Sequence, residues 1–200
     1  LATIVYTSGS TGTPKGVELT HANFVFITYS GVNSMPDIAM KPNRRLLLFL
    51  PLAHVFARYM QFFCFAGNVS LGLSSNLKTI LADFKAFKPT FILAVPRIFE
   101  KIYNAASQKA GAGFKGRVFA DATQTACDWS HAQQSGGSIP LALNAKHALY
   151  NKLVYSSIME VFGGHVEYAV SGGAPLDSSI AHFFNDVGLS LLEGYGMTET

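Results

Sequence analysis

The sequence predicts an α/β fold, in which a largely parallel sheet is flanked by helices. Short apolar runs of strand length, such as residues 46–50 and 91–95, alternate with segments whose apolar residues recur at helical spacing, such as residues 76–87. Strands that alternate with helices favour parallel pairing, with helices on both faces of the sheet. Of the 200 residues, 49% are hydrophobic and 14% are charged, which excludes a disordered chain.

The same patterns place each element along the chain. Pro96 opens one predicted helix, Gly136 and Gly137 separate two longer ones, and Asp177 is a suitable N-cap for the last. We expect residues 1–6 to form a buried strand. The further predicted strands are residues 46–50, 69–73, 91–95, 166–170 and 189–192, and the predicted helices are residues 54–65, 76–87, 96–111, 114–134, 141–162 and 178–187.

Charge and cysteine content narrow the class of protein. The net charge is +3 and no basic run is longer than Arg44-Arg45, so the clustered basic face of a nucleic-acid binder is missing. Cys64 and Cys127 stand far apart and form no Cys-x-x-Cys motif, which predicts reduced cysteines in a cytoplasmic protein. The charged share lies well below the usual quarter, which suggests that much surface is buried against further chain, a ligand or a membrane.

Residues 46–71 are apolar enough to resemble a membrane span. Pro51, His54 and Arg58 would be costly in hydrocarbon, however, and Pro51 signals a turn. We therefore expect a strand, a loop, a buried helix and a second strand in this region. Peripheral contact with a membrane stays open as an alternative.

The strongest local signal is a glycine-rich loop directly after the first apolar run. Residues 7–16 read Thr-Ser-Gly-Ser-Thr-Gly-Thr-Pro-Lys-Gly. Glycines let backbone N–H groups approach an anion closely, hydroxyl groups donate further hydrogen bonds, and Lys15 adds a positive charge, so a polyphosphate is the natural ligand. An ordinary surface loop is the alternative. The candidate phosphate-binding residues are Thr7, Ser8, Gly9, Ser10, Thr11, Gly12 and Lys15.

The spacing of this loop excludes three common motifs. The phosphate loop of kinases and GTPases, Gly-x-x-x-x-Gly-Lys-Ser/Thr, would need a glycine where Pro14 stands. The loop does not match the dinucleotide fingerprint Gly-x-Gly-x-x-Gly either, and the hydrolase motif Gly-x-Ser-x-Gly is absent from the sequence. If the loop binds a polyphosphate, the protein therefore belongs to a class other than these three.

Residues 6–17 resemble the signature phosphate loop of the adenylate-forming superfamily, which includes acyl-CoA synthetases, firefly luciferase and nonribosomal peptide adenylation domains. Three more segments follow in the order that the superfamily requires: residues 50–56 (Leu-Pro-Leu-Ala-His-Val-Phe), 171–176 (Ser-Gly-Gly-Ala-Pro-Leu) and 195–199 (Tyr-Gly-Met-Thr-Glu). Four matches in order make coincidence negligible. The resemblance implies that the chain is part of the large N-terminal domain of an adenylate-forming enzyme.

A fifth segment points to one branch of this superfamily. Residues 95–101, Val-Pro-Arg-Ile-Phe-Glu-Lys, are similar to the Val-Pro-Arg-x-Phe/Trp-Glu-Lys string of long-chain acyl-CoA synthetases, and the long helical region of residues 114–162 suits the same branch. The resemblance implies that ATP, a long-chain fatty acid and coenzyme A are the substrates, with no obligate protein partner. An enzyme that adenylates a medium-chain, aryl or amino acid is the alternative.

The resemblance also implies a role for each motif residue. Thr7 to Lys15 would hold the β- and γ-phosphates of ATP, and Glu199 with Thr7 would bind Mg²⁺, which prefers oxygen ligands. Thr198 would donate a hydrogen bond to the α-phosphate, and His54 would lie beside the carboxylate and the α-phosphate. The residues implied for adenine and ribose binding are Gly172, Gly173, Ala174, Pro175, Tyr195 and Gly196.

Taken singly, these residues have ordinary explanations. A lone histidine in an apolar stretch is usually a core residue, Glu199 could be a surface carboxylate, and residues 173–175 could simply turn the chain from a strand to a helix. Arg58 and Arg97 are flanked by apolar residues, so we expect each to pair with a carboxylate or carbonyl group or to reach solvent.

We expect the chain to be a partial AMP-binding domain over residues 1–200. The superfamily also uses a downstream ribose-binding aspartate, a hinge and a C-terminal domain with a catalytic lysine, and the resemblance implies that these and an N-terminal portion lie outside the chain. Alone, it should then have little or no turnover. Two further hypotheses stay open, namely a nucleotide-binding module without chemistry and a membrane or structural protein built around residues 46–71.

Overall fold

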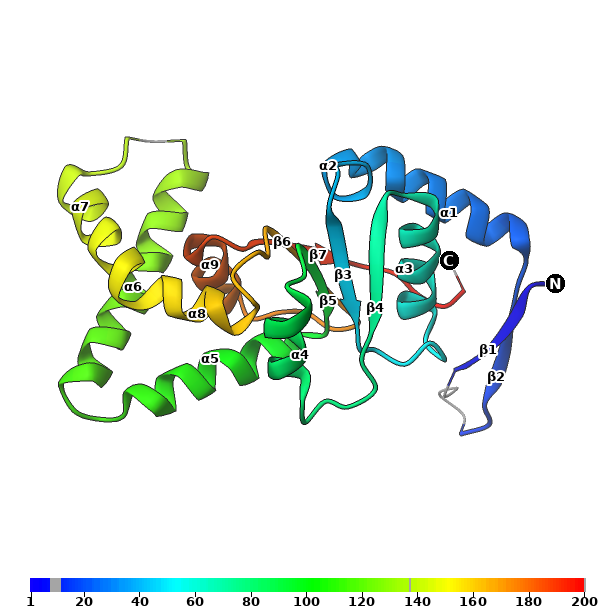
Figure 1. Ribbon diagram of the computed structural model, residues 1–200, viewed down its shortest axis with the longest axis horizontal. Coiled ribbons are helices and arrows are strands. Elements are labelled where there is room, and N and C mark those ends of the chain that lie inside the picture. Colours follow the sequence, from blue (N-terminus) through cyan, green and yellow to red (C-terminus); the bar gives the residue numbers. More distant parts are fainter. Residues whose placement is uncertain (8–11, 137, 200) are drawn as a thin grey trace.

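The computed structural model describes residues 1–7, 12–136 and 138–199. Its centre is a five-stranded sheet with the strand order β4-β3-β5-β6-β7, and every pair of neighbouring strands is parallel (Figure 1). The predicted α/β class and parallel sheet are therefore confirmed. The strands are β3 (Arg44–Leu48), β4 (Val69–Leu73), β5 (Phe91–Ala94), β6 (Tyr168–Gly172) and β7 (Ser190–Gly194).

One face of the sheet is covered by the helices that lie nearest to the amino terminus. These are α1 (His21–Ser34), α2 (Pro36–Ala39) and α3 (Val55–Ala66). Side chains alternate between the two faces of a strand, and Leu46 and Leu48 of β3 pack on this side with Phe63 of α3. The expected strand, loop, helix and strand over residues 46–71 are present. Among the described residues, no helix has both the length and the apolar character needed to cross a membrane.

The opposite face carries the larger core. Leu47, Ile92 and Ala169 point to this side and pack against helices from the second half of the chain. Asp177 caps the last of these helices, because its Oδ1 accepts hydrogen bonds from the N–H groups of Ser179 (2.9 Å) and Ile180 (3.2 Å), as predicted. The helices on this side are α4 (Ile80–Phe87), α5 (Pro96–Ala110), α6 (Phe114–Gln134), α8 (Ser156–Val161) and α9 (Ser178–Val187).

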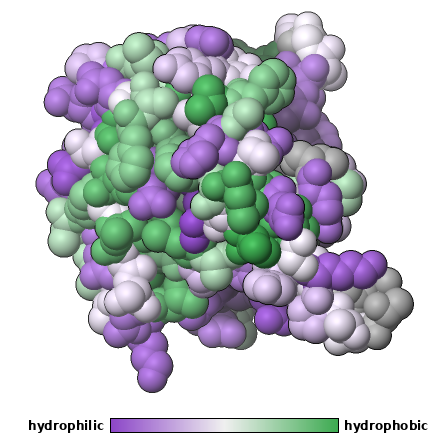
Figure 2. All heavy atoms as spheres, turned by 90° about the vertical axis from the view of Figure 1, so that its right-hand side faces the viewer, coloured by the Kyte–Doolittle hydropathy of each residue, from purple (hydrophilic) through white to green (hydrophobic). Residues whose placement is uncertain are grey.

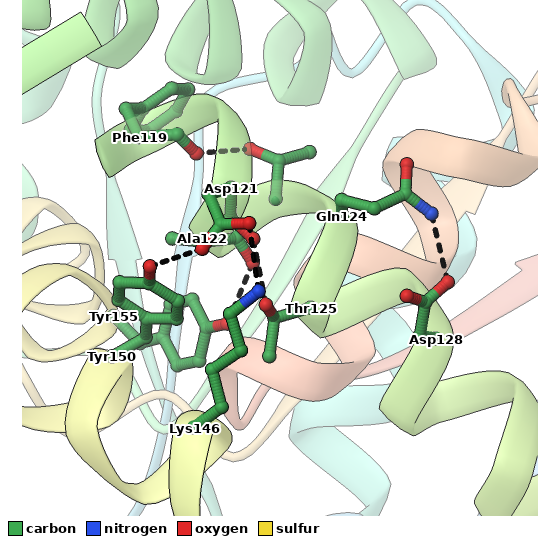
Figure 3. Close-up of polar contacts among 10 residues, drawn as sticks. Phe119, Asp121, Ala122, Gln124, Thr125, Asp128, Lys146, Tyr150 and Tyr155 are labelled. Carbon is green, nitrogen blue, oxygen red and sulfur yellow. Dashed lines mark hydrogen bonds and ion pairs between the residues drawn. The ribbon is translucent and has the colours of Figure 1, made fainter. Parts of the chain in front are cut away.

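A helical extension beyond the sheet is formed by α6 and α7 (Leu141–Tyr150). Two contacts fix α7 on α6, because Asp121 accepts hydrogen bonds from Lys146 Nζ (2.8 Å) and from the Tyr150 hydroxyl (Figure 3). The predicted helix over residues 141–162 is helical throughout, but its middle forms a π-helix, η1 (Asn151–Tyr155). This turn ends on Tyr155, which is fully buried and donates a hydrogen bond to the carbonyl oxygen of Ala122 (2.8 Å). Gly137 lies outside the described residues.

The first strand of the chain differs from its prediction. β1 (Thr3–Thr7) pairs with β2 (Lys15–Leu19) in an antiparallel ribbon that is separate from the main sheet. Only one face of the ribbon is covered, so Val5 is buried while Ile4 is 43% and Tyr6 71% exposed. The prediction of a buried strand at residues 1–6 is therefore wrong, because an apolar run does not reveal whether both faces of a strand are covered.

Candidate functional site

The carboxyl ends of the parallel strands lie at one edge of the sheet, where ligands bind in open α/β folds. Two predicted motifs leave neighbouring strands at this edge, because Gly172 at the end of β6 is paired with Gly194 at the end of β7. Residues 173–175 and 195–199 follow directly on these two positions. The structure therefore brings the two predicted adenine-binding segments side by side.

The amino-terminal turn of α3 meets the same edge. A Cβ atom added to the buried Gly172 would lie 2.8 Å from Cε1 of Phe56, so the ring of Phe56 lies against β6. Phe56 is two residues from His54, which is the N-cap residue of α3. The side chain of His54 is exposed and makes no capping hydrogen bond. His54 thus stands on a helix end that is packed against the β6–β7 edge.

The ribbon of β1 and β2 packs against the same helix. Val5 and Leu19 form a small apolar cluster with Phe24 of α1, and Val55 of α3 lies against that cluster. Since Val55 is the neighbour of both His54 and Phe56, the first turn of α3 links the ribbon to the β6–β7 edge. Phe56 belongs to the motif at residues 50–56, but its contact with β6 could not be predicted from the sequence.

The two residues that flank the glycine-rich loop are paired with each other in the β1–β2 ribbon. Thr7 and Lys15 are opposite each other at the end of the ribbon. Gly12 has φ +82°, a left-handed conformation that favours glycine. The side chain of Lys15 is exposed. The predicted phosphate-binding residues Ser8, Gly9, Ser10 and Thr11 lie outside the described residues.

Arg58 joins the ribbon to the loop that carries His54. Its Nε donates a hydrogen bond to the carbonyl oxygen of Leu52 (3.1 Å), and its Nη1 donates to Oγ1 of Thr3 (3.4 Å). The expectation that Arg58 pairs with a carbonyl group is confirmed. Arg97 is exposed and therefore reaches solvent. Arg58 was not among the predicted site residues. The one sequence feature that suggested a buried partner was its apolar neighbours in the chain.

The turn after β6 has buried residues at both ends and solvent-exposed residues in its middle. Gly173 has φ +85°, and Gly173, Ala174 and Pro175 are exposed. Leu176 is buried and anchors the turn before the N-cap at Asp177.

The segment after β7 presents polar groups to solvent. Tyr195, Gly196 and Glu199 are exposed, and Thr198 is half-buried. Within the described residues, no hydrogen bond or ion pair connects the side chains of His54, Lys15, Thr198 or Glu199 to one another. The described residues also contain no group of three or more His, Cys, Asp or Glu residues that could hold a metal ion. The side chains of these four residues are therefore not joined to one another in the structure.

A family model described as "AMP-binding enzyme" matches residues 1–200, that is, the whole chain. The chain belongs to the AMP-binding enzyme family. This membership confirms the recognition of the adenylate-forming superfamily from the motifs, and the motifs at residues 171–176 and 195–199 leave neighbouring strands at one edge of the sheet.

Relatives of this AMP-binding chain point to one branch of the family. The chain is 47% identical over 199 residues to the long-chain-fatty-acid–CoA ligase FadD15 of Mycobacterium bovis, covering 100% of the chain and 33% of the relative. It is 34% identical over 204 residues to the peroxisomal long chain acyl-CoA synthetase 7 of Arabidopsis thaliana, covering 100% of the chain and 27% of the relative. The AMP-binding chain thus spans about a third of the length of these relatives.

Solved structures share the fold of this AMP-binding chain. The A-PCP didomain of carboxylic acid reductase from Segniliparus rugosus, in complex with AMP, matches with a TM-score of 0.63 and 27% identity, covering 98% of this chain and 23% of that one. The adenylation domain of a carboxylate reductase from Mycobacterium chelonae also gives a TM-score of 0.63, at 24% identity, covering 98% of this chain and 26% of that one. These matches confirm the fold class.

Proposed function

We propose that this chain carries the nucleotide-binding part of a long-chain fatty-acid–CoA ligase. Such an enzyme uses ATP to convert a long-chain fatty acid into an acyl-adenylate, with release of pyrophosphate, and then forms the thioester with coenzyme A. The observation that carries the proposal is the pairing of Gly172 with Gly194, which sets two nucleotide-binding motifs side by side next to the helix that bears His54. The substrate is inferred from the long-chain ligases to which the chain is 47% and 34% identical.

The first half-reaction needs positioning and charge stabilisation more than covalent catalysis. A carboxylate oxygen of the fatty acid bonds to the α-phosphorus of ATP, and the bond to the bridging oxygen breaks, so pyrophosphate leaves with the electron pair. Two anions must be brought together, and negative charge grows on the leaving group. Exposed donors and cations at a fixed edge of the protein meet this need.

The phosphate end of ATP is assigned to the ribbon. Lys15 stands exposed beside Thr7 at the base of the glycine-rich loop, so its ammonium group can pair with the β- and γ-phosphates as pyrophosphate departs. We assign Ser8 to Gly12 to the same phosphates through their N–H and hydroxyl groups. His54 and Thr198 would lie at the α-phosphate, because both motifs meet the β6–β7 edge.

The adenine end of ATP is assigned to the turn after β6 and the segment after β7. Gly173, Ala174 and Pro175 are small and exposed and follow the buried Gly172, and Tyr195 presents an exposed ring just after the neighbouring strand end. An aromatic ring on one side and small residues on the other accommodate a flat base between them. Gly196 continues the turn beside Tyr195.

Mg²⁺ fits the donors that these segments offer. Glu199 supplies a carboxylate and Thr7 a hydroxyl group, and both are oxygen donors of the kind that Mg²⁺ prefers. When bound, Mg²⁺ would neutralise charge on the phosphates. The second half-reaction, in which the coenzyme A sulfur attacks the acyl carbonyl and AMP leaves, is assigned to the longer protein.

We also propose that residues 1–200 are a partial AMP-binding domain, with an N-terminal portion and a C-terminal domain supplied by the longer protein. The basis is the coverage of only 33% and 27% of the two relatives. The isolated chain is then expected to form little or no acyl-CoA. Robust release of pyrophosphate by the isolated chain with palmitate and coenzyme A would contradict this proposal.

The function is tested by exchange of labelled pyrophosphate into ATP, measured on the full-length protein with acetate, octanoate, palmitate, a cinnamate and several amino acids. We expect exchange to peak with palmitate, and to fall by about 10²–10³-fold in Lys15→Ala and Glu199→Ala, as for the loss of a donor to developing charge. Lys152→Ala and Glu160→Ala, which remove exposed charges from the helical region, serve as controls and should leave exchange unchanged.

Each of the other results of the exchange measurement would reject a different part of the proposal. Exchange that peaks on an aryl or amino acid would keep the adenylation chemistry and reject the fatty acid. Exchange that survives in both site variants would reject the assignment of Lys15 and Glu199. The lack of exchange with every acid would favour a nucleotide-binding module without chemistry.

A further inference from the structure

Helix α7 and the π-helical turn η1 expose a row of leucines on their outer side. The side chains of Leu141, Leu149 and Leu153 are 85%, 54% and 62% exposed. Ala145 lies between them and is exposed too. Because residues four apart lie on the same face of a helix, these side chains form one stripe, and the buried Tyr150 faces the core instead. We call Leu141, Ala145, Leu149 and Leu153 the leucine stripe.

The part of the chain that carries the leucine stripe is basic. From the start of α5 to the end of η1, residues 96–155 contain seven Lys or Arg and three Asp or Glu, which gives a net charge of +4. The whole chain carries +3, so the rest of it is slightly acidic. All seven basic side chains are exposed, and two of them belong to α7 and η1. Residues 129–159 contain no Asp or Glu, so no acidic residue of α7 or η1 offsets the positive charge beside the leucines.

A second apolar surface lies at the opposite end of the long axis from α7 (Figure 1). Figure 2 views that end, where apolar residues gather over the side that bears α1, α3 and the ribbon. Phe26 of α1 is 74% exposed there. The two surfaces differ in charge, because α1 contains no Lys, Arg, Asp or Glu. Exposed apolar side chains together with exposed positive charge are therefore a property of the leucine stripe and not of α1.

Leucines beside lysines fit the surface of a membrane that contains anionic lipids. Leucine side chains enter the boundary between headgroups and acyl chains, and the long stem of lysine lets its charge stay at the lipid phosphates. Each Lys or Arg close to such a surface strengthens binding about fivefold. A second copy of the chain is a poorer partner, because two basic faces repel each other. An acidic protein has matching charge but needs a groove shaped to the helix, whereas a bilayer adapts to it.

We propose that the leucine stripe of α7 and η1 docks the protein on the surface of anionic membranes. The helix lies in the plane of the headgroups, and its other side stays packed on the core through the buried Tyr150 and Tyr155. The peripheral membrane contact considered for residues 46–71 is thereby assigned to a different part of the chain. The inference rests on α7, η1 and their charge alone, so it holds whether or not the proposed enzymatic function does.

Co-sedimentation of the natural full-length polypeptide with lipid vesicles tests this proposal. One set of vesicles mixes phosphatidylcholine with the anionic phosphatidylglycerol, and the other set contains phosphatidylcholine alone. Leu149→Ser combined with Leu153→Ser removes two members of the stripe, and Leu141→Ser is a milder change at the first residue of α7. Phe26→Ser is the matched control, since it removes an exposed apolar side chain at the opposite end of the molecule. Circular dichroism would confirm that each variant is folded.

The parent protein should bind the mixed vesicles at least about tenfold more tightly than the neutral ones, and added salt should weaken this binding. The double leucine variant should lose at least about tenfold in affinity for the mixed vesicles, Leu141→Ser a part of that, and Phe26→Ser none. Equal affinity of the parent and the double variant would overturn the proposal, and so would equal binding to both sets of vesicles. A loss in Phe26→Ser alone would replace the stripe with α1. Failure of the parent to bind any vesicle would replace the membrane with an acidic protein.

Discussion

The ring of Phe56 fills the space that a side chain at Gly172 would need. A Cβ atom at position 172 would lie 2.8 Å from Cε1 and 2.9 Å from Cζ of Phe56, and 3.3 Å from the carbonyl oxygen of Gly194. Glycine at this position therefore lets the first turn of α3 approach the paired ends of β6 and β7. The contact ties the helix that bears His54 to the edge where the proposed nucleotide site lies.

Gly172→Ala should disturb this contact. The added methyl group meets the far end of the Phe56 side chain, which can move, and a carbonyl oxygen of the sheet, which cannot move easily. We expect a loss of about 1–3 kcal/mol in the free energy of unfolding, as for other overpacked sites. Urea denaturation of the variant measures this loss.

Two further variants check the cause. Gly196→Ala adds a methyl group where nothing lies within 4 Å, so its unfolding free energy should stay near that of the parent chain. Gly172→Ala combined with Phe56→Leu should recover part of the lost stability, because the smaller side chain vacates the space. Equal stability of Gly172→Ala and the parent chain would contradict the steric argument.

Arg58→Met should loosen the loop that leads to His54. The variant loses the hydrogen bond to the carbonyl oxygen of Leu52 (3.1 Å) and the longer one to Thr3 Oγ1 (3.4 Å), both in a half-buried setting. Hydrogen bonds that involve a charged group contribute about 1.5–3 kcal/mol, so we expect a loss of that order. Amide hydrogen exchange should become faster in residues 52–54.

Thr3→Val separates the two contacts of Arg58. This variant removes only the longer hydrogen bond and keeps the bond to Leu52, so its effect on unfolding should be much smaller than that of Arg58→Met. If Thr3→Val were the more destabilising of the two, Arg58 would act by holding the ribbon and not the loop before His54.

Tyr155→Phe removes a single hydroxyl group from the core. That hydroxyl is fully buried between α6 and η1 and donates to the carbonyl oxygen of Ala122 (2.8 Å) (Figure 3). Loss of a buried hydrogen bond is expected to lower the unfolding free energy by about 1 kcal/mol. Tyr103→Phe is the control, since the described residues include no hydrogen-bond partner for its hydroxyl; a larger effect there would contradict the prediction.

The strands of the main sheet, α3 and the helices on the opposite face could be predicted because their apolar residues follow a recognisable pattern. Residues 46–50 and 91–95 are continuous apolar runs, and Asp177 stands at the start of a strongly periodic helix. No element was predicted for residues 17–45, and β2 and α1 both lie there. α1 is apolar on every side, so it has no polar face to reveal its period.

The site residues could be named from sequence motifs, but the contacts that hold those residues in place could not. Each of the four motifs is a short continuous stretch of residues, and such a stretch can be recognised in a single sequence. The contact of Phe56 with Gly172 and the bond from Arg58 to Leu52 join the motifs in space. These contacts depend on how α3 packs against β6, which no periodicity in the sequence expresses. The π-helical turn at η1 likewise left no signal in the apolar pattern.

A buried carboxyl group in α9 should make folding depend on pH. The side chain of Asp186 is fully buried, and burial raises its pKa to about 7. Its neighbours are His147 Nε2 at 3.0 Å, stacked on Trp129, and the half-buried thiol of Cys127 and the hydroxyl of Tyr155. The atoms of Asp186 and His147 are at ion-pair distance, but neither carboxyl oxygen has a hydrogen bond of good geometry, so the charge is poorly compensated.

The raised pKa fixes the sign of the effect. The folded state holds the proton of Asp186 more tightly than the unfolded state, whose pKa is near 3.8, so this contribution to stability is complete below about pH 4 and is lost as the pH rises through about 7. Burial lowers the pKa of His147, which has the opposite sign and removes stability as the pH falls below its unfolded value of 6.5. The pH-dependent contributions of Asp186 and His147 are both present in the parent chain.

Asp186→Asn isolates the carboxyl term, because His147 stays in place. Relative to the parent chain, the variant should become more stable as the pH rises from 5 to 8, with a slope of at most about 1.4 kcal/mol per pH unit. Asp128→Asn removes an exposed carboxylate from α6 and should run parallel to the parent chain. Urea unfolding at several pH values measures both differences. A constant difference between Asp186→Asn and the parent chain would mean that Asp186 is ionised throughout this range and that His147 compensates its charge.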